Sequence, residues 1–256
     1  MLRYDQDWQT RYADMTATPQ EALAHLKSGQ RVFIGTGCGA PQELIAAMTA
    51  KARAVSNVEI IQLVTKGDAP YANKKLSDSF TLNAFFISSN VRDVIQEGFG
   101  DYTPILLSDV PRLLDSGAMP LDLALIQVTP PDERGLVSLG ISVDIVKSAI
   151  GNATLVIAEV NPNMPWTHGD TLVDVFDLDI LVPVDKPILE RNPDPPNEVA
   201  YTIAKSAAAL IPNGATIELG IGRVPGYGRI PQVVMQFLAE RKDIGFHTEM
   251  ISDAII

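Results

Sequence analysis

The sequence predicts an α/β fold made of two similar open, mostly parallel-sheet domains, of which the second is truncated. The first observation behind this prediction is composition, because apolar residues make up 46% of the chain and aromatic residues only 6%. Aliphatic cores of this kind are typical of parallel sheets covered by helices. The second observation is an internal repeat. The third is the alternation of strand-like and helix-like segments along the chain, which favours a doubly wound sheet.

The repeat consists of the stretches "KSGQRVFIGTGCGAPQELIAAM" and "IPNGATIELGIGRVPGYGRIPQVVMQFL". In each copy we expect a helix to end at a glycine, Gly29 or Gly214, because glycine readily adopts the conformation that closes a helix. A short strand, a Gly-x-Gly turn and a new helix follow, and a Pro-Gln pair opens that helix. A further strand closes each copy, at residues 58–64 and 244–251. Each copy therefore has the pattern of half a doubly wound sheet.

More α/β sequence lies between the two copies. Residues 121–128 and 153–160 are apolar runs expected to form buried strands, and residues 141–150 are expected to form a helix. The segment "VPVDKPILERNPDPPNEV" has the composition of an interdomain linker. We therefore expect a first domain over 1–191 and the beginning of a second over 192–256. A two-stranded piece leaves both faces and an edge uncovered, so we expect the natural protein to continue further.

Charge and cysteine content narrow the function classes. The 256-residue chain has a formal net charge of −11, which argues against a nucleic-acid partner, because phosphate binding needs clustered Lys and Arg. Its single cysteine, Cys38, excludes an internal disulfide and metal sites with paired cysteines, and no metal site is expected. The polar N-terminus is unlike a signal peptide, and no apolar run approaches the ~20 residues that cross a bilayer. We expect a cytoplasmic protein without a membrane partner.

The two Gly-x-Gly turns, residues 35–37 and 220–222, are candidate ligand-binding loops. Such a turn between a strand and a helix lets the backbone approach a ligand, and its amides favour anions or polarised oxygens. Neither turn fits a dinucleotide or Walker pattern. The alternative is a tight turn in which a side chain would clash. The second turn carries an insertion with Arg223 and Arg229, which either hold phosphates or lie in solvent.

Glu249 is the candidate catalytic residue. It lies near the carboxyl end of the expected strand 244–251, where open α/β sheets bind ligands, and this strand should neighbour the strand at 216–220. A carboxylate here serves as a nucleophile, as a general base, or as a structural partner for an amide or arginine. The aligned residue of the first copy is Leu63, and this asymmetry favours a role beyond folding. His247 is expected on the same strand face as Glu249.

Several stretches carry a resemblance to a known family. They include "IGTGCGAPQEL", "VTPPDERGLVSLGISVDIVKSAI", "DILVPVDKPI" and "IPNGATIELGIG", and the most diagnostic are "NPNMPWTHGD" and "HTEMISD". In these stretches the chain resembles the acetyl-CoA hydrolase / 4-hydroxybutyrate CoA-transferase family of class I CoA-transferases. The resemblance spans nearly the whole chain. It implies two similar α/β domains that face each other across an active site.

The resemblance also implies an activity: transfer of CoA from an acyl-CoA, expected to be acetyl-CoA, to a small carboxylic acid. The family's nucleophile is the glutamate of the "HTEM" motif, here Glu249. It attacks the thioester to give an acyl–glutamyl anhydride and a CoA thiolate, and the thiolate returns to form a glutamyl-CoA thioester. CoA and acyl-CoA are thus substrates, and no covalently bound cofactor is expected at rest. A homo-oligomer is implied for the full-length protein.

CoA binding is implied for the second glycine turn, at Gly220, Ile221 and Gly222. The insertion interrupts the family motif after that turn, and Arg229 and Ile230 are carried over across this interruption. Two alternatives to a transferase stay open. One is an acetyl-CoA hydrolase of the same family, in which water takes the acyl group. The other is a non-catalytic acyl-CoA-binding or scaffold fragment.

The residue types suit this chemistry. A glutamate in water has a pKa of about 4.3, so it is ionised at neutral pH and needs no separate base. Carboxylates are poor nucleophiles in water, so the site must exclude solvent. The oxyanion that develops on the thioester needs hydrogen-bond donors. The backbone amides around Gly37, Cys38 and Gly39 are the candidates for this oxyanion and acyl pocket.

Overall fold

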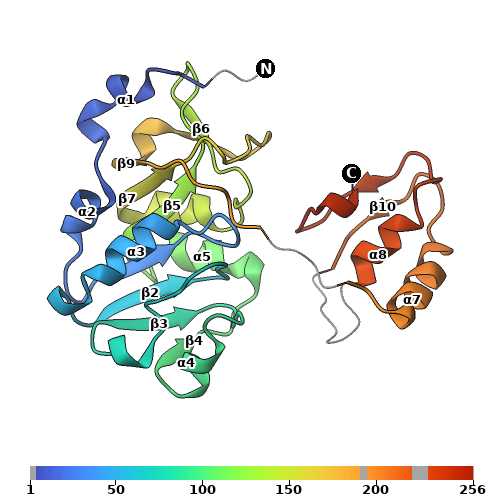
Figure 1. The fold of residues 1–256 in the computed structure, drawn as a ribbon, viewed down its shortest axis with the longest axis horizontal. Helices are drawn as coiled ribbons and strands as arrows, with labels where there is room; N and C mark the ends of the chain where they lie inside the picture. The colour runs from blue at the N-terminus through green and yellow to red at the C-terminus, as the bar shows by residue number, and fades with distance from the viewer. Residues whose placement is uncertain (1–3, 191–194, 221–229, 256) are drawn as a thin grey trace. The chain divides into compact units, whose positions relative to one another are not determined.

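The computed structural model describes residues 4–190, 195–220 and 230–255. The chain divides into two compact units, Met1–Glu190 and Arg191–Ile256 (Figure 1). The expected domain boundary, after residue 191, lies one residue away from this division. That the second unit is the beginning of a second CoA-transferase domain stays a prediction.

The first unit is built on a seven-stranded sheet in the order β4-β3-β2-β1-β5-β7-β9, and every strand pair in it is parallel. Its strands are β1 (Arg31–Ile34), β2 (Val58–Gln62), β3 (Phe80–Ala84), β4 (Gly100–Tyr102), β5 (Leu121–Val128), β7 (Ala153–Val160) and β9 (Ile180–Pro183). The α/β prediction with a mostly parallel sheet is confirmed. The strand order reverses between β1 and β5, and open α/β sheets bind ligands at such a point.

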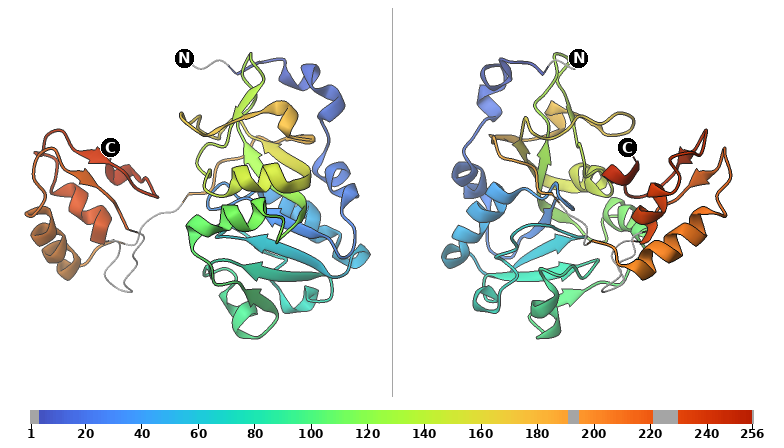
Figure 2. Two further views of the ribbon diagram at one scale, coloured as in Figure 1. Left: turned by 180° about the vertical axis from the view of Figure 1, so that it is seen from behind. Right: turned by 45° about the vertical axis from the view of Figure 1, so that its right-hand side comes forward.

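Helices cover both faces of this sheet (Figures 1 and 2). One face carries α2 (Pro19–Ala22), α3 (Gln42–Ala50) and α4 (Arg92–Gln96), and the other carries α1 (Trp8–Arg11), α5 (Val110–Asp115) and α6 (Val146–Asn152). Alternate strand residues supply the two cores: Val32 and Ile34 of β1 pack towards α3, and Phe33 packs towards α6. Short 3-10 turns complete the unit, at Ala13–Met15, Leu23–His25, Ala52–Ala54, Lys74–Leu76, Leu107–Asp109 and Val175–Asp177.

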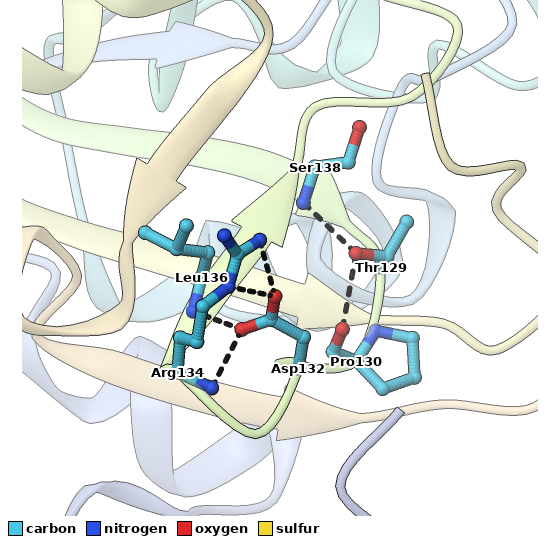
Figure 3. A network of polar contacts seen from close by, with 6 residues as sticks. All are labelled: Thr129, Pro130, Asp132, Arg134, Leu136 and Ser138. Atoms are coloured by element: carbon cyan, nitrogen blue, oxygen red, sulfur yellow. Dashed lines mark hydrogen bonds and ion pairs between the residues drawn. The ribbon is translucent and has the colours of Figure 1, made fainter. Parts of the chain in front are cut away.

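A small antiparallel sheet of β6 (Leu136–Ser138) and β8 (Leu172–Asp174) follows the central strands. The turn that leads into β6 is organised by Asp132 (Figure 3). Its carboxylate accepts the backbone amides of Arg134 and Leu136 at 2.9 and 3.0 Å and the Arg134 guanidinium at 2.9 and 2.8 Å. Burial raises the pKa of Asp132, but these hydrogen bonds outweigh it and hold the pKa below its usual value.

Thr129 closes the same turn from its other side (Figure 3). Its hydroxyl accepts the amide of Ser138 at 2.9 Å and donates to the carbonyl of Pro130 at 3.1 Å. The backbone amide of Thr129 also donates to the Ser138 carbonyl at 3.0 Å. The chain therefore leaves Ser138 in a fixed direction, towards the loop that precedes α6.

The second unit contains α7 (Glu198–Ala208), β10 (Thr216–Ile217), α8 (Ile230–Gln236), β11 (Gly245–Phe246) and a 3-10 turn at Asp253–Ile255. The two strands pair in parallel, as expected. The predicted strand at 244–251 is wrong in length, because β11 ends at Phe246. Beyond it, the backbone amide of His247 still donates to the carbonyl of Ile217, and the bonds to Leu219 are made by the side chain of Thr248.

The internal repeat is confirmed by the strand register. Arg31 of β1 lies opposite Glu59 of β2, and Thr216 of β10 lies opposite Gly245 of β11. These four residues are matched in the sequence alignment of the two copies. The alignment that sets Leu63 against Glu249 therefore follows the register of both strand pairs.

The turns before the strands repeat as well. Asn57 and Asp243, at matching positions before β2 and β11, have φ of 53° and 57°, and they are the non-glycine residues with positive φ in the described ranges. Gly29 and Gly214 also have positive φ, of 76° and 75°. They do not end helices as predicted, because each lies in a turn several residues after the preceding helix. Their amides instead tie that turn to the residue before Asn57 or Asp243, each at 2.9 Å.

Other predicted elements agree with the structure to different degrees. Residues 121–128 and 153–160 match β5 and β7 end to end, whereas the helix expected at 141–150 begins only at Val146. Pro41 lies at the N-cap of α3 rather than inside the helix, and Pro231 is the second residue of α8. Among the described residues, no helix has the length and apolarity required to cross a bilayer. A cytoplasmic location stays a prediction.

Candidate functional site

The first glycine loop lies where the strand order reverses. The amide of Gly35 donates to the carbonyl of Leu125 in β5 at 2.8 Å, and the amide of Gly37 donates to the carbonyl of Val64, beyond β2, at 2.7 Å. The loop is thereby tied to the strands on both sides of β1.

The loop is also filled by the segment that precedes α6. The hydroxyl of Thr36 contacts the hydroxyl of Ser142 and the carboxylate of Asp144, and the Ser142 hydroxyl donates to the Thr36 carbonyl at 2.7 Å. A Cβ placed on Gly39 would lie 2.7 Å from the Cβ of Ser142. Close packing therefore explains why residue 39 is a glycine. This agrees with the alternative interpretation of the loop, a tight turn in which a side chain would clash. The contacts of Ser142 and Asp144 also explain why the helix begins late.

The predicted oxyanion donors are engaged within the chain. Besides the Gly37 bond to Val64, the amide of Gly39 donates to the carbonyl of Thr36 at 3.1 Å. Cys38 is half-buried and has an interaction partner of its own. These contacts weigh against an oxyanion-binding role for the two glycine amides in this arrangement.

Glu159, in the carboxyl-terminal half of β7, is a buried carboxylate that sequence analysis missed. Only 3% of its surface is exposed, and its carboxylate accepts the amide of Leu44, in the first turn of α3, at 2.7 Å. The N-cap residue of α3, Pro41, makes no side-chain capping bond. Glu159 therefore caps α3 from a distant strand, where a helix N-terminus favours an acceptor. A lone Glu inside the apolar run "ATLVIAEV" was the available signal.

The environment of Glu159 shifts its protonation. Burial raises the pKa of Glu159 to about 7; the Leu44 hydrogen bond opposes this rise, and the neighbouring Glu43 carboxylate adds to it. Because Glu159 already occupies the N-terminus of α3, that helix end is not free for an anionic ligand. The first glycine loop is packed in this structure, and its role as an oxyanion and acyl pocket stays a prediction.

In the second unit, Glu249 lies in a bend beyond β11 and is exposed. The preceding residue, Thr248, holds this bend in place: its hydroxyl accepts the amide of Leu219 at 3.0 Å and donates to the carbonyl of Leu219 at 3.2 Å. The bend is thus fixed beside the start of the second glycine turn at Gly220. Within the described residues, the carboxylate of Glu249 forms no hydrogen bond or ion pair.

His247 and Glu249 do not share a strand face, because β11 ends before both of them. The backbone amide of His247 donates to the carbonyl of Ile217 at 3.0 Å, and its side chain is exposed. The same-face prediction is therefore wrong. Thr248, between the two, is the residue whose side chain makes the structural contact.

Gly220 differs from Gly39. It is exposed, none of the described atoms lies within 4 Å of an added Cβ, and its φ lies outside the positive range. Neither packing within the described residues nor backbone conformation requires glycine there. The predicted CoA-binding residues Ile221, Gly222 and Arg229 lie outside the described residues, as does Arg223. Ile230 begins α8, and its side chain packs against the core of the unit.

No three residues among His, Cys, Asp and Glu come together as a possible metal site in the ranges that the structure describes. The polar side chains at the carboxyl ends of the central strands instead bind one another. The amide nitrogen of Asn161, after β7, donates to the side-chain oxygen of Gln127 in β5 at 2.9 Å.

A parallel sheet whose strand order reverses beside a glycine loop places the first unit among the open α/β folds that bind ligands at this point. Residues 1–190 match the family model described as "Acetyl-CoA hydrolase/transferase N-terminal domain". The chain belongs to this acetyl-CoA hydrolase/transferase family.

Two curated relatives are CoA-transferases. The chain is 37% identical over 250 residues to 4-hydroxybutyrate coenzyme A transferase of Clostridium kluyveri. The match covers 98% of this chain and 57% of that protein. It is 36% identical over 249 residues to succinyl-CoA:acetate/propanoyl-CoA:succinate CoA transferase of Fasciola hepatica, covering 96% and 50%. The chain therefore spans between half and three fifths of the length of these relatives.

Two solved structures are similar. A 4-hydroxybutyrate CoA-transferase from Porphyromonas gingivalis matches with a TM-score of 0.81 and 31% identity, over 97% of this chain and 57% of that one. RipA from Yersinia pestis matches with a TM-score of 0.88 and 24% identity, over 98% and 59%. The second similarity shows the fold alone.

The contact between Gly39 and Ser142 predicts that Gly39→Ala destabilises the first unit, by about 1–3 kcal/mol, because the new methyl group overlaps the Ser142 side chain. Urea unfolding followed by tryptophan fluorescence measures this effect, since both tryptophans, Trp8 and Trp166, lie in the first unit. The control is Gly151→Ala, where nothing lies within 4 Å of the added Cβ. Equal stabilities of the two variants would contradict the packing explanation.

The raised pKa of Glu159 predicts a pH effect on stability. The protonated form is favoured in the folded state, so its contribution is fully present below about pH 4.5 and is lost as pH rises through about 7. Glu159→Gln keeps the acceptor for Leu44 and cannot ionise. We expect the variant to gain about 3 kcal/mol over the wild type between pH 5 and pH 8, measured by the same fluorescence. A difference between the two proteins that does not change with pH would refute this assignment.

Proposed function

We propose that this chain is part of a CoA-transferase that moves CoA from an acyl-CoA to a small carboxylic acid, with Glu249 as the nucleophile. The observation that carries the proposal is the Thr248 contact, which holds Glu249 beside Leu219 and the second glycine turn. Family membership and the CoA-transferase names of the relatives support it. The relatives' named reactants are carboxylic acids and their CoA thioesters.

The proposed reaction begins with attack of a Glu249 carboxylate oxygen on the thioester carbon. The carbon–sulfur bond breaks, CoA leaves as a thiolate, and an acyl–glutamyl anhydride remains on the protein. The thiolate then attacks the glutamyl carbon of the anhydride, and the donor acid leaves as a carboxylate. The resulting glutamyl-CoA thioester reacts with the acceptor carboxylate through the same steps in reverse. No proton has to be removed from the nucleophile, because a carboxylate is already ionised at neutral pH.

The second glycine turn is proposed to bind CoA through Gly220, Ile221 and Gly222. Gly220 supports this role because its missing side chain leaves open space on the described side of the turn. A backbone without a Cβ lets a ligand approach the amides closely. CoA and acyl-CoA are substrates in this proposal, and no covalently held cofactor is required. A homo-oligomer of the whole protein is part of the proposal.

Acetyl-CoA is the proposed acyl donor. The family name covers hydrolases as well as transferases, so hydrolysis is the second candidate. In a hydrolase, water instead of an acceptor acid cleaves the anhydride or the glutamyl thioester. The difference lies in how well solvent is kept from the covalent intermediate.

Covalent trapping tests the nucleophile. The whole natural gene product is incubated with acetyl-CoA and then with hydroxylamine, which converts a glutamyl thioester into a hydroxamate. Mass spectrometry of the digested protein should find the modification at Glu249, and Glu249→Ala should lack it. A carboxylic acid added before the hydroxylamine should remove the modification and yield a new acyl-CoA. Loss of the modification without any added acid, with free CoA and acetate as the products, would indicate hydrolysis. Identical spectra for the wild type and Glu249→Ala would contradict the proposal.

The open space at Gly220 gives a separate prediction. Gly220→Ala should leave the thermal unfolding temperature unchanged, because the added methyl group meets no described atom. It should raise the KM for acyl-CoA about tenfold, which corresponds to about 1.4 kcal/mol, if the ligand approaches the turn. Gly151→Ala, on an exposed position of α6, is the control with an unchanged KM. An unchanged KM for Gly220→Ala would remove this turn from the binding site.

A further inference from the structure

The two units differ in how a glutamine at the start of a helix is used. In the first unit, Gln42 opens α3 and holds the loop that follows β2. Its side-chain oxygen accepts the amide of Asp68 at 2.9 Å, and its side-chain nitrogen donates to the carbonyl of Lys66 at 3.4 Å. The glutamine therefore joins the helix to the chain beyond the second strand of the repeat.

The matching glutamine of the second unit is Gln232, because Pro41-Gln42 aligns with Pro231-Gln232. Continued without a gap beyond the paired strands, the alignment sets Lys66 against Ser252 and Asp68 against Ala254. In the structure, the side-chain oxygen of Gln232 is buried and has no hydrogen-bond partner. The hydroxyl oxygen of Ser252 is also buried and without a partner among the described residues.

These two unpaired oxygens lie on elements that pack together. α8, which carries Gln232, contacts the 3-10 turn at Asp253–Ile255, directly after Ser252. Ala254 and Ile255 pack against the same small core as the buried residues of α8. A buried amide oxygen without a donor costs free energy comparable to a lost hydrogen bond. A donor is therefore expected for Gln232. In the first unit that donor is the backbone amide of Asp68, whose counterpart is Ala254, whereas in the second unit the unpaired hydroxyl of the same segment is that of Ser252.

Glu249 lies on the segment that such a bond would hold. Thr248 anchors one end of this segment to Leu219, through two hydrogen bonds. Ser252 marks the other end, and its side chain is not anchored. A hydrogen bond from the Ser252 hydroxyl to the side-chain oxygen of Gln232 would hold the segment at both ends, with Glu249 between them.

We infer that Gln232 is a positioning residue for Glu249, acting through a hydrogen bond that its side-chain oxygen accepts from Ser252. This inference rests on the proposed role of Glu249 as the nucleophile. Gln232 does not touch the reacting atoms. It limits the motion of the bend that carries the carboxylate, and a nucleophile held in its attacking position reacts faster.

The first test measures the rate of covalent labelling of Glu249 in the whole natural gene product, with acetyl-CoA and hydroxylamine. Gln232→Met, which keeps the size of the side chain, and Ser252→Ala should each slow the labelling about tenfold, with the half-saturating acetyl-CoA concentration within about twofold of the wild type. The double variant should be no slower than the slower single variant, because the two residues share one bond. Ser252→Thr keeps the hydroxyl and should retain the rate.

The second test does not depend on activity. Amide hydrogen exchange of residues 249–252 in the 256-residue chain should become about fivefold faster in Gln232→Met and in Ser252→Ala. Gln236→Met is the matched control, because Gln236 is an exposed glutamine on the same helix, and it should leave this exchange unchanged. Unchanged exchange in both test variants, or additive slowing of labelling in the double variant, would overturn the inference. Absent labelling in the wild type together with faster exchange in the variants would instead reject the proposed nucleophile.

Discussion

The register of the first parallel strand pair is the constraint on which both units depend. A left-handed residue, Asn57 or Asp243, precedes the second strand, and a glycine amide from the preceding turn bonds just before it. Parallel strands are joined by a long crossover, and this turn is where the returning chain is aligned with the first strand. Once the register is set, the glycine turn after one strand and the segment that follows the other lie together. In the second unit that segment carries Glu249, three residues after the end of β11.

The two copies of this arrangement have diverged in what fills the carboxyl ends of their strands. In the first unit, Ser142 packs against Gly39, and Glu159 occupies the helix N-terminus, so the polar groups satisfy one another. In the second unit, Gly220 has open space on its described side and Glu249 is exposed. The duplicated architecture thus has a packed glycine turn in the first unit, whereas Gly220 and Glu249 of the second are exposed within the described residues. The buried hydroxyls of Thr36 and Ser142 require partners, and they supply one another together with Asp144.

Sequence patterns predicted the elements whose environment is uniform. β5 and β7 are buried on both faces, so their continuous apolar runs indicated their ends correctly. β11 was predicted too long because Met250 and Ile251 extend the apolar run, whereas the side chain of Thr248 makes the hydrogen bonds to Leu219. Glu159 was missed because its partner, the first turn of α3, lies far away in the chain. Local patterns do not contain that contact, nor do they contain the bonds of the Gly37 and Gly39 amides to the carbonyls of Val64 and Thr36.

The contact between Gly39 and Ser142 has a consequence for how the family's sequences diverge. The two positions occupy one volume, so a larger residue at either one requires a smaller residue at the other. Among related proteins that keep this loop conformation, positions 39 and 142 should therefore co-vary, with the summed size of the two side chains nearly constant. Position 220 has no such neighbour in the described part of the chain, so none of the described positions should co-vary with it in this way.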